Sequence, residues 1–362
     1  MNVTFFIGGL SGGGAERVVC SLASFLVAKG HEVEILTLSD EAPSYLLDAR
    51  VTRTSLIRQQ ERRSFAYNFV LRVLRCVKYL RRHQTDAYVV VLPRTIELLL
   101  SLRWLVKAPV IASERGGFSN YPAKFQKKLK RLAPNADGWV FQTPEIRQWY
   151  GSSVRDAVII PNAINPDFIL PSSSSPFKGD KRGSVIVSAG RLSWQKNHLL
   201  LIEAFGKIAG KYPDYRLVIY GDGYLRQTME DKIARLNLGG RVEMPGFTEN
   251  IGEAIRNAAL FVLSSDFEGM PNALMEAMAL GVPCVSTDSD GGGARFLIED
   301  GKNGLLVPKG DVDALARAMD KMLADAQYAE SLGREAHRIC ERLAPEKIYG
   351  EWEKYIESKI RR

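Results

Sequence analysis

Short apolar runs alternate with longer amphipathic stretches along most of the chain. The runs are rich in β-branched and aromatic residues and have the length of buried strands. They lie at residues 3–7, 32–38, 87–92, 110–113, 138–142 and 157–160, and again at 185–189, 216–220, 241–244, 260–263 and 282–286. Helical patterns separate many of them. This alternation predicts parallel, doubly wound sheets, so the expected fold class is α/β.

The two series of strands are separated by a segment of linker composition. Residues 171–176 are Pro-Ser-Ser-Ser-Ser-Pro, and glycine and charged residues follow. We therefore expect a first domain at 1–166, a linker at 167–183, a second domain at 184–344 and a final helical stretch at 345–362. A chain of 362 residues is long enough for two domains with sizeable cores.

The first strand leads into a glycine-rich loop at residues 8–14 and then a predicted helix at 15–29. Gly13 and Gly14 suit a backbone that approaches a ligand closely. The loop differs from the dinucleotide-binding fingerprint, because Arg17 stands where the third glycine belongs. It also lacks the Gly-Lys-Ser/Thr of a phosphate-binding NTPase loop.

Two carboxylates flank a predicted helix start in the second half. Glu268 follows the apolar run 259–263. Glu276 lies eight residues later, in a run of good helix formers at 273–280. In open parallel sheets ligands bind outside the carboxyl ends of the strands, where a helix N-terminus offers free N–H groups. Pro271 suits that first turn. Glu268 could contact hydroxyls near a phosphate and Glu276 a ribose, or both could be surface carboxylates.

The loop after residues 185–189 carries two cations, Arg191 and Lys196. Together with a helix N-terminus they could neutralise a pyrophosphate, whereas surface ion pairs are the alternative. Gly221 and Gly223 follow the next predicted strand and allow close backbone approach to a ligand.

The net charge of +8 is unevenly distributed. Residues 1–166 hold 23 Lys and Arg against 13 Asp and Glu, whereas residues 167–362 hold 26 against 28. Basic amphipathic stretches occur at 62–82, with Phe69 on the apolar face, and at 124–131, where the basic residues are Lys124, Lys127, Lys128 and Arg131. Such helices suit an anionic membrane surface, although packed helices with solvated basic faces are the alternative. No nucleic-acid-binding motif accompanies the charge.

We expect a reduced, cytoplasmic protein. Cys20, Cys76, Cys284 and Cys340 are far apart and form no zinc or disulfide pattern. The N-terminus has no signal-peptide pattern, and no apolar stretch has the length of a membrane span.

Several ordered motifs closely resemble the retaining GT-B glycosyltransferases of family 4. They are the E-x7-E element from Glu268 to Glu276, the Gly-Arg-Leu-x-x-x-Lys loop at 190–196, the Gly-Asp-Gly turn at 221–223 and the segment 291–308. The opening Gly-Gly-Gly-Ala-Glu-Arg at 12–17 resembles members that build bacterial surface glycans. The resemblance spans nearly the whole chain.

The resemblance implies two Rossmann-like domains facing a cleft, with the C-terminal helix crossing back to the first domain. Arg191 and Lys196 would bind the donor pyrophosphate, Glu268 the sugar hydroxyls and Glu276 the ribose. The remaining donor contacts would come from Gly13, Gly14, Gly221, Met270, Pro271, Asn272 and Ala273. The anomeric configuration would be retained, with a donor phosphate oxygen helping to deprotonate the acceptor hydroxyl.

One departure concerns a histidine that many members carry after a first-domain strand. None of the four histidines lies there, and the chain has Ser-Glu-Arg at 113–115 instead. The resemblance makes Glu114 a catalytic residue and places Arg115 and Arg17 near the acceptor or the reacting sugar.

The resemblance also implies the partners. We expect a UDP-hexose or UDP-N-acetylhexosamine donor, a polyprenyl-diphosphate-linked oligosaccharide acceptor, and attachment to the inner face of the cell membrane. No metal or cofactor is expected, although Asp288 and Asp290 match a three-residue metal-binding pattern. A nicotinamide-dependent dehydrogenase and a non-catalytic sugar-nucleotide-binding protein are the alternatives.

Overall fold

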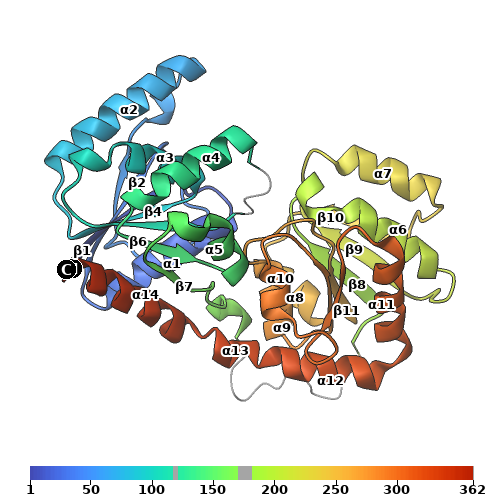
Figure 1. Cartoon of the computed structure of the whole chain (residues 1–362). Coiled ribbons are helices and arrows are strands. Elements are labelled where there is room, and N and C mark those ends of the chain that lie inside the picture. Colours follow the sequence, from blue (N-terminus) through green and yellow to red (C-terminus); the bar gives the residue numbers. More distant parts are fainter. Residues whose placement is uncertain (117–120, 170–181, 362) are drawn as a thin grey trace. The chain divides into compact units, whose positions relative to one another are not determined.

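The computed structural model describes residues 1–116, 121–169 and 182–361. The chain divides into two compact units (Figure 1). Unit 1 comprises Met1–Ala163 and Glu346–Arg362, and unit 2 comprises Ile164–Pro345. The expected linker lies mostly outside the described residues, and its first residues belong to a short 3₁₀ helix, η6 (Pro166–Phe168).

Unit 1 contains a seven-stranded parallel sheet in the order β3-β2-β1-β4-β5-β6-β7. The order reverses direction between the neighbours β1 and β4, which makes this a topological switch point. The strands are β1 (Asn2–Ile7), β2 (Glu32–Thr37), β3 (Thr52–Ser55), β4 (Ala87–Val91), β5 (Val110–Glu114), β6 (Gly138–Phe141) and β7 (Ala157–Ile159). The central strand β4 is buried throughout, as expected for a strand covered on both faces.

Helices cover both faces of this sheet. The helices are α1 (Gly14–Ala28), α2 (Phe65–Arg82), α3 (Pro93–Ser101), α4 (Ala123–Leu132), α5 (Pro144–Tyr150) and α14 (Pro345–Ile360), with the 3₁₀ turns η1 (Gln59–Glu61), η2 (Arg103–Leu105), η4 (Ala133–Asn135) and η5 (Gly151–Ser153). Buried residues of α2 to α5 share one core with the sheet. On the other face α1 and α14 meet, where the rings of Phe25 and Tyr349 lie 5.4 Å apart.

Unit 2 contains a six-stranded parallel sheet in the order β10-β9-β8-β11-β12-β13. Its strands are β8 (Val185–Ala189), β9 (Arg216–Tyr220), β10 (Val242–Gly246), β11 (Leu260–Leu263), β12 (Cys284–Asp288) and β13 (Leu305–Pro308). Its helices are η7 (Trp194–Lys196), α6 (His198–Ile208), α7 (Arg226–Arg235), α8 (Ile251–Arg256), α9 (Asn272–Ala279), α10 (Gly293–Leu297), α11 (Val312–Ala324), α12 (Ala326–His337) and α13 (Ile339–Arg342). The switch point lies between β8 and β11.

The two parallel sheets confirm the predicted α/β, doubly wound fold. Most apolar runs became strands within a residue or two of their expected ends. Helix α2 is a partial correction, because its apolar stripe is buried only in the C-terminal half. Cys76 and Leu80 lie in the core, whereas the side chain of Phe69 is 58% exposed. Figure 1 shows the N-terminal half of α2 extending away from the sheet of unit 1.

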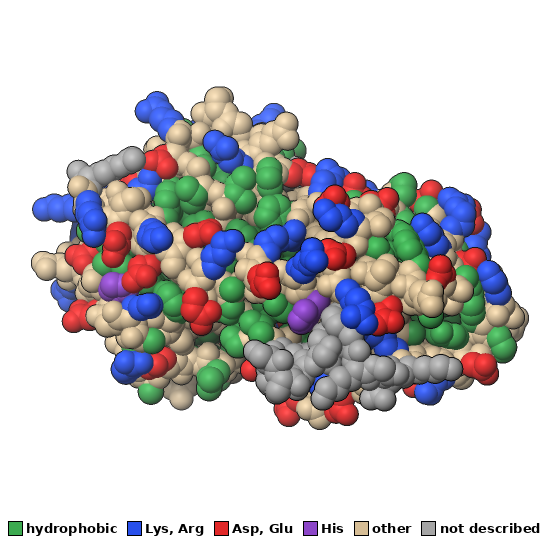
Figure 2. All heavy atoms as spheres, turned by 90° about the horizontal axis from the view of Figure 1, so that it is seen from below, with side chains coloured by type: hydrophobic (Ala, Val, Ile, Leu, Met, Phe, Trp, Pro, Cys, Tyr) green, Lys and Arg blue, Asp and Glu red, His purple; other side chains and the backbone are tan. Residues whose placement is uncertain are grey.

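The described helices include none that is long and apolar enough to cross a membrane. The face of the molecule in Figure 2 carries Lys and Arg side chains interspersed with Asp and Glu. The basic excess of the first half therefore does not form a single-sign patch on that face.

Candidate functional site

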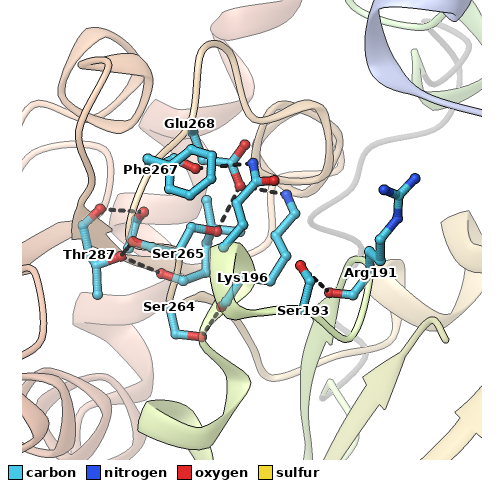
Figure 3. A network of polar contacts seen from close by, with 11 residues as sticks. Arg191, Ser193, Lys196, Ser264, Ser265, Phe267, Glu268 and Thr287 are labelled. Carbon is cyan, nitrogen blue, oxygen red and sulfur yellow. Dashed lines mark hydrogen bonds and ion pairs between the residues drawn. The ribbon is translucent and has the colours of Figure 1, made fainter. Parts of the chain in front are cut away.

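The predicted cation and carboxylate of unit 2 are in direct contact. Lys196 lies in η7, after β8, and Glu268 lies in the loop after β11, and these two strands are neighbours in the sheet. The Lys196 Nζ donates to Glu268 Oε1 at 2.5 Å, and Ser265 Oγ donates to the same oxygen at 2.7 Å (Figure 3). The Glu268 residue is only 6% exposed. Its carboxylate is thus fixed in orientation at the carboxyl edge of the sheet.

Further hydrogen bonds join the two loops that carry these residues. Ser264 Oγ donates to the carbonyl of Lys196 at 3.0 Å, and Gln195 Nε2 donates to the carbonyl of Phe267 at 3.2 Å. Asn197, which has a left-handed conformation with φ of 43°, donates to Asp266 Oδ1 at 2.9 Å. The loops after β8 and β11 therefore form one connected structure.

The helix start predicted after Glu268 is present, since α9 begins at Asn272 and Pro271 precedes it. Met270 and Glu276 are both buried, with 6% exposure each. Burial of Glu268 and Glu276 shows that their alternative interpretation as surface carboxylates is wrong. Ala273, in the first turn of α9, is partly buried.

Arg191 is not part of the network around Glu268. Its side chain is exposed, and its guanidinium points away from Lys196 in Figure 3. The loop after β8 thus presents its two predicted cations in different directions.

Two glycines are required by contacts between neighbouring loops. A Cβ atom on Gly221 would lie 2.1 Å from the carbonyl oxygen of Gly190, and one on Gly291 would lie 2.2 Å from the carbonyl oxygen of Glu268. The close contact at Gly221 sets the spacing of the loops after β8 and β9. Approach of the Gly221 backbone to a ligand stays a prediction.

The Asp288 and Asp290 carboxylates are each neutralised by a different cation. Asp288 Oδ1 accepts from Arg295 at 2.7 Å, and Asp290 pairs with Lys309 at 2.7 Å. In the part of the chain that the structure describes, the one His/Cys/Asp/Glu group with metal-ligand spacing is His31, Glu353 and Glu357 in unit 1. Among the described residues, Asp288 and Asp290 therefore form no metal-binding group with a third ligand.

In unit 1 the glycine-rich loop lies at the carboxyl end of β1. Gly14 begins α1, and the N–H of Gly13 donates to Tyr45 Oη at 3.2 Å. Burial raises the pKa of the Tyr349 phenol in α14, and the charge of Arg17, in the first turns of α1, is close enough to oppose that rise. The glycine loop and the C-terminal helix thus both contribute to the surroundings of Arg17.

Glu114 ends β5 and is fully buried. Tyr150 Oη donates to Glu114 Oε2 at 3.2 Å, and the N–H of Gly116 donates to Oε1 at 2.9 Å. Burial raises the pKa of Glu114 to about 7, although these hydrogen bonds oppose the rise. The carboxyl group can therefore gain or lose a proton near neutral pH.

Arg115 is buried next to Glu114 in sequence but has different neighbours. Its Nε donates to Ser113 Oγ at 3.1 Å and its Nη1 donates to Asn162 Oδ1 at 2.6 Å. The guanidinium lies 5.3 Å from the ring centroid of Trp352 in α14. Burial lowers the pKa of Arg115 to about 10, so the side chain stays charged at neutral pH.

The basic helix α4 packs through its apolar stripe. Phe125 and Leu129 are buried, whereas Lys124, Lys127 and Arg131 are exposed. Lys128 is partly buried and pairs with Glu97 at 2.6 Å. Three of the four predicted basic residues thus face solvent together.

Comparison with known proteins identifies the family. The model of the family described as "Glycosyl transferases group 1" matches residues 173–338, and that of "Glycosyltransferase Family 4" matches residues 12–168. The chain belongs to glycosyltransferase family 4. Its two Rossmann-like domains are of the GT-B type, and the predicted family and fold are confirmed.

Three proteins similar to this glycosyltransferase illustrate the match. The GalNAc-α-(1→4)-GalNAc-α-(1→3)-diNAcBac-PP-undecaprenol α-1,4-N-acetyl-D-galactosaminyltransferase of Campylobacter jejuni subsp. jejuni is 29% identical, covering 98% of each chain. A second enzyme of that organism, N-acetylgalactosamine-N,N'-diacetylbacillosaminyl-diphospho-undecaprenol 4-α-N-acetylgalactosaminyltransferase, is 26% identical, covering 97% of this chain and 98% of its own. The structure of Anabaena Alr3699/HepE with UDP and glucose has a TM-score of 0.85 at 19% identity, covering 99% of this chain and all of that one.

Some polar neighbours in this glycosyltransferase were not found from the sequence. Ser265 precedes Glu268 by three residues, so its position in the loop was a usable signal. Tyr150 and Asn162 carry no such signal, because they reach Glu114 and Arg115 only through the pairing of β5, β6 and β7.

Proposed function

We propose that this glycosyltransferase retains the anomeric configuration and transfers a hexose or N-acetylhexosamine from a UDP-sugar to a polyprenyl-diphosphate-linked oligosaccharide. The observation that carries the donor proposal is the fixed Lys196, Glu268 and Ser265 cluster beside the start of α9. The acceptor proposal rests on the C. jejuni relatives, whose names specify undecaprenol-linked substrates.

The donor would bind at the carboxyl edge of the unit 2 sheet. Lys196 and Arg191 would neutralise the diphosphate, and the first N–H groups of α9, at Asn272 and Ala273, would contact the phosphate. Glu268 would hold sugar hydroxyls and Glu276 the ribose. Charge develops on the diphosphate as the sugar leaves, so cations placed there stabilise the transition state more than the bound substrate.

Unit 1 would supply Glu114, Arg115 and Arg17 to the reacting sugar or the acceptor, with Gly13 and Gly14 approaching the donor. The acceptor hydroxyl would attack on the face from which the diphosphate leaves, and its proton would pass to a phosphate oxygen. Neutralisation of the diphosphate by protein cations removes the need for a divalent ion, in line with the separate ion pairs of Asp288 and Asp290.

We also propose peripheral attachment to the inner face of the cell membrane. Lys124, Lys127 and Arg131 of α4 form an exposed basic surface, with Lys128 beside it. Helix α2 adds exposed apolar side chains, since Phe69 and Leu74 are 58% and 62% exposed. A helix with basic and apolar surfaces in solvent is suited to a lipid headgroup layer.

Thermal-shift titrations with UDP, GDP, ADP and a panel of UDP-sugars, each with and without EDTA, test the donor proposal. A ligand that binds only the folded state raises the melting temperature by mass action. We expect UDP and one UDP-sugar to stabilise the protein equally with and without EDTA. Preference for GDP, or loss of the shift in EDTA, would contradict the proposal.

Transfer to a lipid-linked acceptor tests the chemistry. Glu114→Ala should abolish transfer while the UDP shift survives, because Glu114 belongs to unit 1. Wild-type turnover in this variant would remove Glu114 from the mechanism. UDP binding without turnover in the unmodified protein would instead favour the non-catalytic alternative.

A further inference from the structure

Arg115 is a buried cation whose side-chain hydrogen bonds, within the described residues, go to neutral groups. Its residue is 9% exposed, and its hydrogen bonds go to the Ser113 hydroxyl and the Asn162 amide oxygen. Asn162 also accepts from Gln142 Nε2 at 2.7 Å. The ion pairs formed within residues 1–116, 121–169 and 182–361 provide no carboxylate for this guanidinium.

The other Lys or Arg classed as buried in the described chain, Lys359, is 5% exposed and pairs with Asp156. The partly buried Lys196 pairs with Glu268. A buried charge without a counter-charge is costly, and neutral hydrogen-bond acceptors recover only part of the lost hydration. Among the residues that the structure describes, Arg115 therefore lacks the anionic partner that burial normally requires.

The position of Arg115 indicates what that partner is. The residue directly follows β5, at the carboxyl edge of the unit 1 sheet and next to β4 of the switch point, where open parallel sheets bind ligands. The fork geometry of a guanidinium matches the oxygens of a phosphate. Near Asn162, the amide oxygen of Gln142 is buried and has no hydrogen-bond partner among the described residues, so these polar groups are incompletely satisfied as well.

We propose that Arg115 is an anion receptor that binds a phosphate-bearing group of a substrate, with Asn162 and Trp352 holding the guanidinium in place. The proposal deepens the proposed function and rests on it, because that function supplies two phosphate-bearing substrates. One is the nucleoside diphosphate of the donor, and the other is the polyprenyl diphosphate of the acceptor. Both diphosphates offer the anionic oxygens that the guanidinium requires, whereas a neutral sugar ring does not.

The test compares Arg115→Met with a matched control, Arg241→Met. Arg241 is also an arginine whose guanidinium lies against an aromatic ring, that of Phe205 at 5.8 Å, but it donates to the backbone carbonyls of Tyr212 and Tyr215. Removing a structural arginine leaves those carbonyls without their donor and lowers the melting temperature. Removing an uncompensated charge should leave the melting temperature of the ligand-free protein unchanged or raise it.

Dissociation constants are then measured on the full chain with UDP, farnesyl diphosphate and farnesol. We expect Arg115→Met to weaken the binding of UDP or of farnesyl diphosphate at least about tenfold, because one charge-assisted contact is lost. Weaker binding of UDP identifies the donor as the source of the phosphate. Weaker binding of farnesyl diphosphate identifies the acceptor as that source. Arg115→Lys, which keeps the charge, should recover part of the affinity, and farnesol should respond to neither substitution.

Two outcomes overturn the proposal. One is unchanged affinity for both UDP and farnesyl diphosphate in Arg115→Met. The other is a fall in melting temperature as large as that of Arg241→Met, which would make Arg115 structural. These outcomes differ from a failure of the proposed function. In that case UDP would not stabilise the unmodified protein, whatever the Arg115 variants do.

Discussion

Glu114 and Arg115, adjacent residues at the end of β5, are both buried, and burial changes their charge states differently. Arg115 keeps its charge at neutral pH, whereas the pKa of Glu114 rises to about 7 because burial penalises the carboxylate. Tyr150 and the N–H of Gly116 donate to the carboxyl group but do not offset its burial. The proton on Glu114 is consequently linked to folding.

Glu114→Gln should change how stability depends on pH. In the unfolded chain the carboxyl group loses its proton near pH 4.5, but in the folded chain only near pH 7. The folded state binds more protons between these values, so the wild-type free energy of unfolding should fall as pH rises from about 4.5 to 7, by roughly 3 kcal/mol. Glutamine does not titrate and should remove this fall. Urea unfolding of both proteins at pH 5 and pH 8 measures it, and parallel pH profiles would refute it.

Ser265→Ala should lower turnover more than donor binding. Ser265 and Lys196 donate hydrogen bonds to the same oxygen of Glu268. The Ser265 hydroxyl therefore helps to set the orientation of the carboxylate. A hydrogen bond to a charged group contributes about 1.5–3 kcal/mol, which corresponds to a tenfold to hundredfold loss in kcat. The UDP dissociation constant should change little, because Glu268 is proposed to bind the sugar.

Ser188→Ala is the matched control for Ser265. The hydroxyl of Ser188, on β8, is buried and has no hydrogen-bond partner in the described part of the chain, so its removal should leave kcat unchanged. Equal kcat for Ser265→Ala and Ser188→Ala would show that orientation of Glu268 does not limit the reaction.

At the scale of the elements, the sequence predicted strands better than it predicted contacts. The strands β8, β9 and β11 have the ends expected from their apolar runs, since a strand covered on both faces is apolar along its length. Strand β3 was missed because Thr-Arg-Thr-Ser forms a polar edge with no hydrophobic signal. Contacts such as that of Ser265 with Glu268 depend on how loops fold, which periodicity does not encode.

Gly291→Ala tests whether loop packing positions the site. Its Cβ would meet the carbonyl oxygen of Glu268 at 2.2 Å, and its φ of 93° already disfavours a side chain. Gly310 has a φ of 76° with open space beside it, so Gly310→Ala isolates the cost of conformation. We expect Gly310→Ala to lose roughly 1 kcal/mol of stability and keep its activity. Gly291→Ala should lose more stability and most of its activity, measured by thermal unfolding and transfer assays, and equal behaviour would count against this role.

Across the whole molecule, charge and chemistry are divided between the units. The cluster around Glu268 lies in unit 2, which is close to neutral overall, whereas the basic excess and the exposed residues of α4 lie in unit 1. The sequence predicted this asymmetry from counting alone. It could not predict that Lys128 would pair with Glu97, because that contact needs α3 beside α4.

Replacing Lys124, Lys127 and Arg131 together by Gln should weaken binding to anionic liposomes. Each basic residue near an anionic surface contributes about 1 kcal/mol, so the triple variant should bind roughly a hundredfold more weakly at low salt. The control replaces Lys207, Lys211 and Arg216 in unit 2, which removes the same charge from side chains already paired with Asp313, Asp320 and Glu243. Co-sedimentation at rising salt measures both, since screening weakens electrostatic attachment. Equal losses in the two variants would mean that net charge alone attracts the protein, and binding that ignores salt and anionic lipid would exclude electrostatic attachment through α4.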